Sequence, residues 1–237
     1  MSNYLLFQLY GPLASWGDIA VGEYRPSFAH PSKSAIIGLL AAALGIRRDE
    51  EERQNSLAAT FSFAVRVDAM GVLLRDYHTT QVPSAKRGVT HYTRQSELAI
   101  DDLNTILSSR DYLCDAVYTV AITVANGSPY SLEEFASALA MPVFTLYLGR
   151  KSCPLAMPLH PQIVNAATLR DALASVPPIA ELTDIISKDD TNVFWEGDIE
   201  SGLACQQVII RRDEPRSRKR WQFSDRRENY GVFRKEE

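Results

Sequence analysis

The chain has 237 residues, of which 46% are hydrophobic and 23% are charged, and it carries a formal net charge of −4. This composition predicts a sizeable folded core and excludes a wholly disordered protein. The acidic balance argues against a general nucleic-acid coat protein, because phosphate binding depends on Lys and Arg. Any contact with a polyanion therefore has to rest on local clusters of basic residues.

The spacing of the cysteines and the lengths of the apolar runs indicate the compartment in which the protein is expected. Cys114, Cys153 and Cys205 lie far apart and no CxxC pair occurs, which argues against a disulfide framework and a zinc site. Three scattered thiols, which we expect to be buried, fit a reducing cytosol. The longest apolar run, Ala35–Ile46, is too short to span a bilayer, and the N-terminus lacks the features of a signal peptide. We therefore expect a cytoplasmic protein with no membrane contact, metal or cofactor.

Five segments of the first 150 residues read as strands, because they are rich in β-branched and aromatic residues and most end at Gly or Pro. These predicted strands are Tyr4–Tyr10, Thr60–Ala69, Val72–Tyr77, Ala116–Val124 and Val143–Leu148. The second and third are separated by a turn at Gly71 and together predict a hairpin. Asn126-Gly127 predicts a turn after the fourth.

Two helices are marked by capping residues. The first begins at Ser32 or Ser34 and ends at Gly45. The second begins at Ser131, which forms a capping box with Glu134 three residues on. The resulting order β-α-β-β-α-β matches the ferredoxin-like unit, so we expect an α+β fold of that class.

The segment Thr79–Arg110 is polar and has no strong periodicity, apart from a possible short helix around Ile100–Leu107. We predict an insertion here that projects from the core. The less regular C-terminal third has a short helix near Leu169–Leu173 and strand candidates at Asn192–Trp195 and Gln206–Arg211. The predicted division is a core of residues 1–78 and 112–153, an insertion of residues 79–111, and a small C-terminal subdomain of residues 154–237.

Aromatic and basic side chains alternate in the loop that precedes the first helix. Single-stranded RNA is held in this way, with bases on aromatic faces and phosphates on cations or at a helix N-terminus. The candidates are Trp16, Tyr24, Arg25, His30, Lys33 and Ser34. By composition alone, a surface loop whose aromatic side chains fold back onto the core is the better interpretation.

A glycine followed by two cations ends the last predicted strand of the core. Gly149 lets backbone N–H groups approach an anion, and Arg150, Lys151 and Ser152 complete a phosphate site. The order required for a Walker A motif is missing. A plain turn with solvated charges is the alternative.

The basic half of the insertion and the C-terminal tail are the remaining cationic stretches. The candidates in and beside the insertion are Arg75, His78, Lys86, Arg87, His91, Tyr92 and Arg94. The tail Arg211–Glu237 has ten basic and six acidic residues, and its basic start could touch RNA or an acidic protein. Charge-rich loops and tails are, however, often only solvated.

One set of side chains has the composition of a metal-independent ribonuclease. Tyr77, Lys86, His91 and Tyr92 supply a general base, a general acid and a cation for the phosphate. RNA contact without catalysis, or a plain surface position, is the stronger interpretation. The four histidines show no metal-ligand spacing, so we expect no metal site.

Six motifs in this order resemble the CasD family, the Cas-five subunits of type I-E CRISPR Cascade complexes in the RAMP superfamily. They are LxGPxxxWG at Leu9–Gly17, RPxxxxPSKSxxxGLLxAxLG at Arg25–Gly45, RDYHT at Arg75–Thr79, YLCDA at Tyr112–Ala116, LYLGRKSCPL at Leu146–Leu155 and RDEP at Arg212–Pro215. The resemblance runs from end to end, and the segment around Gly149 is its most specific part. The chain departs from the family mainly at Val82–Leu107.

The resemblance implies a ferredoxin-like RNA-binding core, with residues 79–111 as a thumb. Such a subunit grips the 5′ handle of the CRISPR RNA, caps the backbone formed by CasC and touches the large subunit CasA. Its thumb crosses the RNA and interrupts the guide–target duplex, which brings it near target DNA and neighbouring small subunits. RNA cleavage in these systems belongs to CasE, so the resemblance implies a non-catalytic subunit.

Two other functions stay open from the sequence. A related branch in type I-C systems cuts repeat RNA itself, and Tyr92, His91 and Lys86 would then form the endoribonuclease site. An unrelated ferredoxin-like domain that binds only protein is the third possibility.

Overall fold

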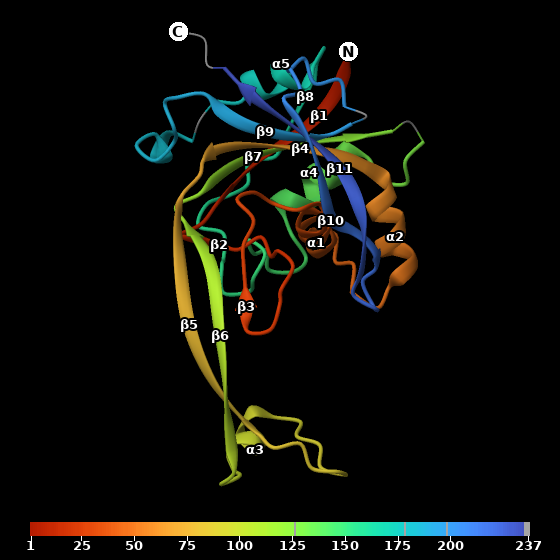
Figure 1. Ribbon diagram of the computed structural model, residues 1–237. Helices are drawn as coiled ribbons and strands as arrows, with labels where there is room; N and C mark the ends of the chain where they lie inside the picture. Colours follow the sequence, from red (N-terminus) through yellow and green to blue (C-terminus); the bar gives the residue numbers. More distant parts are fainter. Residues whose placement is uncertain (126, 178, 198, 235–237) are drawn as a thin grey trace.

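A computed structural model describes residues 1–125, 127–177, 179–197 and 199–234 (Figure 1). Its main element is a seven-stranded sheet in the order β10-β11-β9-β4-β7-β1-β8, in which neighbouring strands are antiparallel. The strands are β1 (Ser2–Tyr10), β4 (Phe61–Ala69), β7 (Val117–Val124), β8 (Gln162–Ala166), β9 (Thr191–Glu196), β10 (Gln207–Ser217) and β11 (Gln222–Phe233). A smaller sheet joins β2 (Leu13–Ala14), β3 (Tyr24–Arg25), β5 (Val72–Pro83) and β6 (Leu103–Cys114).

Strand β1 is buried on both of its faces, which explains its continuous apolar sequence. Leu5, Phe7 and Leu9 belong to a core with α1 and α4, while Tyr4 and Leu6 belong to a core with α5. The helices are α1 (Lys33–Ala43), α2 (Glu51–Thr60), α3 (Arg94–Leu98), α4 (Leu132–Ala140) and α5 (Leu169–Ala174), with a short 3-10 helix at Ala180–Leu182. The sheet is therefore the middle layer of a mixed α/β fold with helices on both faces.

Both predicted helix starts are confirmed. The Ser32 side chain accepts a hydrogen bond from the backbone N–H of Ala35, so Ser32 and not Ser34 caps α1. Ser131 and Glu134 form the expected capping box of α4. Asn126, the first residue of the predicted turn after β7, lies outside the described residues.

The predicted hairpin of Thr60–Ala69 and Val72–Tyr77 is wrong, although both strands exist. Strand β4 pairs with β7 and β9, whereas β5 pairs with β6. The chain leaves the main sheet at Gly71, whose positive φ of 69° and close approach to Cys114 and Ala116 leave no room for a side chain. The turn therefore redirects the chain into a second sheet.

The predicted strand Val143–Leu148 is also wrong. The backbone N–H groups of Val143 and Phe144 donate to the carbonyls of Ala43 and Ala42 at the end of α1, at 3.0 and 3.1 Å. These donors bond carbonyls at the end of the helix, so they are not available to a sheet. Strand β8 pairs with β1 at this edge of the sheet instead.

Strands β5 and β6 form a long two-stranded ribbon that extends away from the main sheet (Figure 1). Their register runs from Val72 opposite Cys114 to Pro83 opposite Leu103, and α3 lies near the far end. The short helix predicted around Ile100–Leu107 is wrong, because most of that segment pairs with β5 as part of β6. Pairing with a partner strand overrides the weak local preference.

The C-terminal third completes the main sheet. Strand β8 pairs with β1, and β9 joins β4 to the β10–β11 hairpin. The predicted strands Asn192–Trp195 and Gln206–Arg211 fall on β9 and β10, and the predicted helix near Leu169 is α5. Strand β11 was not predicted, because its charged sequence hides the alternation of buried and exposed residues.

Two expectations, that no segment spans a membrane and that the three thiols are buried, can be compared with the fold. Within the described residues, no helix is long and apolar enough to cross a membrane. The three thiols are free, but only Cys153 is buried, whereas Cys114 is half-buried and Cys205 is exposed. The expectation of three buried thiols is therefore wrong, because β10 begins just beyond Cys205 at the open edge of the sheet.

The capping box of α4 makes a direct prediction about stability. Ser131→Ala removes the acceptor for the N–H of Glu134 and is expected to lower the free energy of unfolding by about 1 kcal/mol. Ser137→Ala, at an exposed position inside the same helix, is the matched control and is expected to be neutral or slightly stabilising. Urea denaturation followed by circular dichroism measures both. Equal losses in the two variants would contradict the role of the cap.

Candidate nucleic-acid interface

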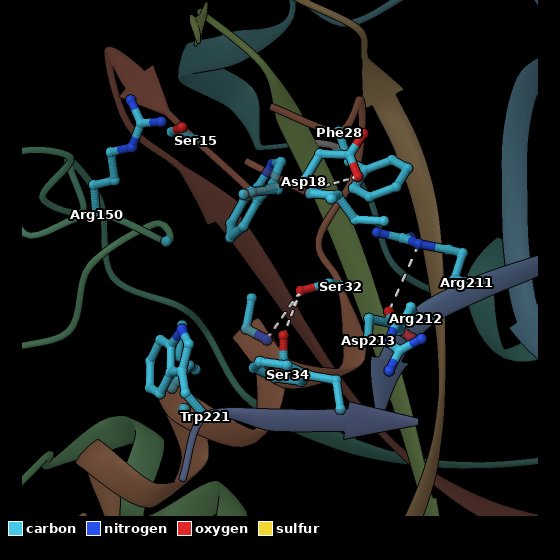
Figure 2. A pocket seen from close by; sticks show the side chains of 18 of the residues that line it. Ser15, Asp18, Phe28, Ser32, Ser34, Arg150, Arg211, Arg212, Asp213 and Trp221 are labelled. Atoms are coloured by element: carbon cyan, nitrogen blue, oxygen red, sulfur yellow. Dashed lines mark hydrogen bonds and ion pairs between the residues drawn. The ribbon is translucent and has the colours of Figure 1, made fainter. Parts of the chain in front are cut away.

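A cleft of about 1030 Å³ lies where four distant segments of the chain meet (Figure 2). Its walls come from the loop after β2, the first turns of α1, the loop around Gly149 and the β10–β11 hairpin. Five arginines and three aspartates line it: Arg48, Arg150, Arg211, Arg212 and Arg218, with Asp18, Asp213 and Asp225. The lining is therefore basic in a chain that is acidic overall, which is the pattern of a polyanion site.

Gly149 is required by packing as well as by backbone conformation. Its φ is +83°, and a Cβ at this position would overlap with the backbone oxygen of Ser15. The N–H of Ser15 in turn donates to the carbonyl of Leu148 at 3.0 Å. The N–H of Gly149 itself donates to the carbonyl of Tyr147 at 3.1 Å. The glycine fixes the loop that carries Arg150 and Lys151 against the β2 segment.

Arg150 is held beside the start of the ribbon. Its guanidinium donates to the carbonyl of Arg25 at 3.0 Å and to that of Asp111 at 3.4 Å, and it lies 4.9 Å from the ring centre of Tyr112. Lys151 and Ser152 follow on the exposed side of the loop. The structure therefore brings Gly149, Arg150 and Arg25, three of the predicted RNA contacts, close together.

Asp111 is the centre of a network that the sequence did not predict. Its buried carboxylate accepts hydrogen bonds from Arg75 at 2.8 Å and from the hydroxyl of Tyr24 at 2.5 Å. The hydrogen bond from Arg75 is the main cause that holds the pKa of Asp111 below its usual value, and Tyr24 and the charge of Arg150 act in the same direction. Three predicted residues are thus fixed around one carboxylate at the base of the ribbon.

The network leaves these side chains partly accessible. Tyr24 is 39% exposed, and Arg75 lies over its ring at 5.0 Å from the ring centre. Arg25, on the same short strand, is also exposed. An aromatic ring with cations beside it is the arrangement that holds single-stranded nucleic acid.

His30 and Lys33 are not on the surface, which corrects two predicted RNA contacts. Both are buried in a group of charged side chains that we call the ion cluster, consisting of His30, Lys33, Glu196, Arg211, Asp213, Arg226 and Glu228. Lys33 pairs with Glu196 at 2.9 Å, and the His30 ring stacks on Phe194 at 3.8 Å between ring centres. Their partners lie on β9–β11, far along the sequence, so no local pattern around His30 and Lys33 indicates burial.

Glu228 is the acid that most clearly depends on the ion cluster. Burial alone would raise its pKa, but the hydrogen bond with His30 and the charges of Arg211 and Arg226 lower that pKa to about 2. Arg226 pairs with it at 2.7 Å and with Asp213 at 2.9 Å. For His30 itself, burial is the main cause that lowers the pKa, so the ring is neutral at pH 7.

The N-terminus of α1 is occupied by the protein's own anion. The backbone N–H of Lys33 donates to a carboxylate oxygen of Asp213 at 2.8 Å. A carboxylate at this position is favoured by the helix dipole. We predicted an RNA phosphate at this helix start, but the carboxylate of Asp213 occupies that position. Ser34, in the first turn of the helix, lines the cleft.

Trp16 is also corrected as a base-stacking residue. It is 2% exposed, and its ring packs edge-on against Tyr118 with 5.4 Å between ring centres. Its backbone N–H donates to the hydroxyl of Ser27. The indole therefore closes the inner end of the cleft as part of the core, which is the alternative that composition favoured for this aromatic residue.

The remaining candidates lie along the ribbon and toward its far end, away from the main sheet (Figure 1). Arg94 pairs with Glu97 at 2.7 Å and also contacts the carbonyl of Gln81, while His78 pairs with Asp76 on β5. Lys86, Arg87, His91 and Tyr92 lie between β5 and α3. The structure therefore divides the predicted residues into a group at or beside the cleft and a group farther along the ribbon.

The predicted nuclease set lies on this ribbon. Tyr92 is 91% exposed and Tyr77 is also exposed, whereas His91 is half-buried. None of Tyr77, Lys86, His91 and Tyr92 lines the cleft. Across the described residues, no group of His, Cys, Asp or Glu could hold a metal ion.

Three comparisons with known proteins agree on one family. A family model described as "CRISPR-associated protein (Cas_Cas5)" matches residues 4–228. The chain is 34% identical over 198 residues to "CRISPR system Cascade subunit CasD" of Escherichia coli (strain K12), which covers 80% of this chain and 83% of that protein. A solved chain from a "CRISPR RNA-guided surveillance complex" has a TM-score of 0.68 at 27% identity, and the match covers 98% of this chain and 90% of that chain. A "Crystal structure of Cas protein" has a TM-score of 0.62 at 27% identity, with 98% and 95% covered.

The close contact between Gly149 and Ser15 predicts that an alanine at position 149 destabilises the protein more than an alanine at position 88. Gly88 has a similar φ of +79°, but a side chain there would meet open space. Gly88→Ala is therefore expected to cost about 1 kcal/mol from backbone strain alone. Gly149→Ala adds the overlap with Ser15 and is expected to cost about 3 kcal/mol in total. Equal losses in urea denaturation would show that the contact with Ser15 is unimportant.

The ion cluster predicts a pH dependence of stability. The folded pKa of Glu228 lies below its ordinary value of 4.5, so its contribution is present above pH 4.5 and is lost as the pH falls toward 2. Glu228→Gln leaves Arg211 and Arg226 short of a buried partner and is expected to cost about 3 kcal/mol at pH 7. The variant should also lose less stability than the wild type on acidification.

Urea denaturation at pH 7 and pH 3 measures both effects. Asp101→Asn, at an exposed position outside the ion cluster, is the control and should leave the wild-type pH profile unchanged. Parallel losses on acidification in the wild type and Glu228→Gln would contradict the assignment to Glu228.

Proposed function

The chain belongs to the Cas5 family of CRISPR-associated proteins, and we propose that it is a non-catalytic, cytoplasmic Cascade subunit that grips the 5′ handle of CRISPR RNA. The observation that carries this proposal is the junction at Asp111. There the Gly149 loop, β3 and the base of the ribbon meet, and cations and an exposed aromatic ring lie beside a basic cleft. These are the side chains that bind phosphates and bases of single-stranded RNA.

The strand order supports a ferredoxin-like core within the larger sheet. Strands β4, β7, β1 and β8 are adjacent and antiparallel, and α1 and α4 connect them in the order β-α-β-β-α-β. In this interpretation the ribbon, including residues 79–111, is the thumb. Residues 154–237 are the C-terminal part, which supplies β8 to this core and adds β9–β11 to the same sheet.

The proposed RNA path has two parts. At the cleft it uses Ser34, Gly149 and Arg150, and beside the cleft it uses Tyr24, Arg25, Arg75, Lys151 and Ser152. Along the ribbon, His78, Lys86, Arg87, His91, Tyr92 and Arg94 accompany RNA that crosses the thumb. We leave Trp16, His30 and Lys33 out of the contacts, because their side chains are buried.

The partners follow from the same family role. The chain caps the CasC backbone, touches the large subunit CasA and lies near target DNA, the guide duplex and neighbouring small subunits. Exposed apolar residues at the base of β5, Val72, Leu73 and Leu74, are suited to a protein contact of this kind. We assign no catalytic residue and no cofactor.

RNA binding should depend on the two cations after Gly149. Replacing Arg150 and Lys151 together by alanine is expected to weaken binding of repeat RNA. It should also reduce the slope of log K against log salt by about 1.4, because each single-strand phosphate contact contributes about 0.7. The double variant Lys188→Ala and Arg234→Ala removes the same charge outside the cleft and should leave the slope nearly unchanged. Lys151→Ala alone tests the exposed half without removing the internal contacts of Arg150.

A gel assay with labelled repeat RNA, with and without EDTA, reads binding and cleavage together. If the proposal is right, the RNA migrates as a complex with the protein and is not cleaved. Specific cleavage that persists in EDTA would overturn the non-catalytic assignment, and a salt slope that is the same in the double variant and the wild type would overturn the phosphate contacts.

A further inference from the structure

The turn of the β10–β11 hairpin carries an aromatic ring that the fold itself does not explain. Trp221 is 59% exposed and has a φ of +56°, a backbone conformation that is unfavourable for a bulky side chain. Glycine or asparagine would fit this turn with less strain. Strain at an exposed residue that contributes little to the core is typical of a functional position.

The ring is held in place and is partly covered, because Arg48 lies over one face of it, but 59% of the residue is exposed. Phe223 packs against it edge-on, with 5.9 Å between ring centres at 81°, and Arg48 lies 4.9 Å from its ring centre. Trp221, Phe223 and Arg48 all line the cleft that contains Arg150 (Figure 2). The indole therefore offers an open aromatic surface at the cleft that receives RNA in the function proposed above.

Arg218, in the same turn, has a positive charge without an acidic partner. Its side chain contacts the carbonyl of Ser34, and its buried Nε has no hydrogen-bond partner among the described residues. No carboxylate in the described part of the chain lies within ion-pair distance of it. Burial is the main cause that lowers the pKa of Arg218, and the nearby charge of Arg48 adds to this. Neither Arg218 nor Arg48 has an ion-pair partner among the described residues, although Asp225 also lines the cleft, so the two guanidinium groups can bind an anion.

We propose that Trp221, Arg218 and Arg48 form a nucleotide subsite for single-stranded RNA, in which a base stacks on Trp221 and its phosphate binds the two arginines. An open aromatic face beside unpaired cations matches both parts of a nucleotide. An acidic peptide would use the cations but would gain little from the exposed indole. The inference rests on the proposed RNA-binding function and adds a second contact region to it, at the hairpin instead of the Gly149 loop.

Tryptophan fluorescence can test the stacking directly. The chain has three tryptophans, and Trp16 and Trp195 are only 2% and 3% exposed. Because Trp16 also lines the cleft, the part of the quenching that is lost in Trp221→Tyr is the part that reports on Trp221. Titrating the full chain with a short single-stranded RNA is expected to give saturable quenching. An RNA with abasic positions should quench much less, because it lacks the bases that stack.

Variants separate the base contact from the phosphate contact. Trp221→Ala is expected to weaken RNA binding about tenfold, whereas Trp221→Tyr keeps an aromatic face and most of the affinity. Arg218→Ala should reduce the salt slope by about 0.7. Arg216→Ala, an exposed cation in the same hairpin that does not line the cleft, is the matched control and should leave the slope close to the wild type. Thermal unfolding of each variant checks that the hairpin still folds.

The outcomes distinguish this inference from the function on which it rests. If Trp221 is not quenched and Trp221→Ala binds RNA normally, while the Arg150 and Lys151 double variant is impaired, the nucleotide subsite is wrong and the proposed function stands. If the wild-type chain does not bind the RNA, both fail. Quenching by an acidic peptide such as polyglutamate but not by RNA would overturn the subsite in favour of a protein contact.

Discussion

The ion cluster is the constraint on which the shape of the candidate RNA site depends. It joins the β10–β11 hairpin to the start of α1, because Asp213 accepts the N–H of Lys33 and Glu228 contacts His30, while Arg226 and Arg211 hold Glu228 within the hairpin. Buried charges of this kind are unfavourable when one partner is missing, so the hairpin has one arrangement against the helix. That arrangement turns one wall of the cleft, including Arg212 and the hairpin turn, toward the loop around Gly149.

The opposite wall is fixed by close backbone contacts and by a second carboxylate. Gly149 lets its loop pack directly on Ser15, and Asp111 gathers Arg75 and Tyr24 at the point where the ribbon leaves the body. These contacts hold cations in defined positions without neutralising the whole site. A chain with a net charge of −4 can therefore present a locally basic cleft, which explains why total charge is a poor guide to its binding partner.

Much of the fold could be predicted from local patterns, since the apolar run of β1 and the capping box at Ser131 need no distant partner. The errors arose where distant contacts decided the outcome. Lys33 lies 180 residues from Asp213, and its burial leaves no local mark in a loop rich in cations. The role of Asp111 was not predicted, because a single acidic residue at the end of a polar segment is usually exposed to solvent. Trp221 lies in a basic tail, where only the structure shows that it borders the cleft.

The measurement that tests the account most directly is where RNA lies on the chain. Repeat RNA carrying 4-thiouridine can be photo-cross-linked to the full chain, and mass spectrometry can then identify the attached peptides. If RNA binds as proposed, we expect cross-links in β3 at Tyr24, in the loop that follows Gly149 and along the β5–β6 ribbon. Cross-links confined to α5 and β8, with none at or beside the cleft, would contradict this prediction.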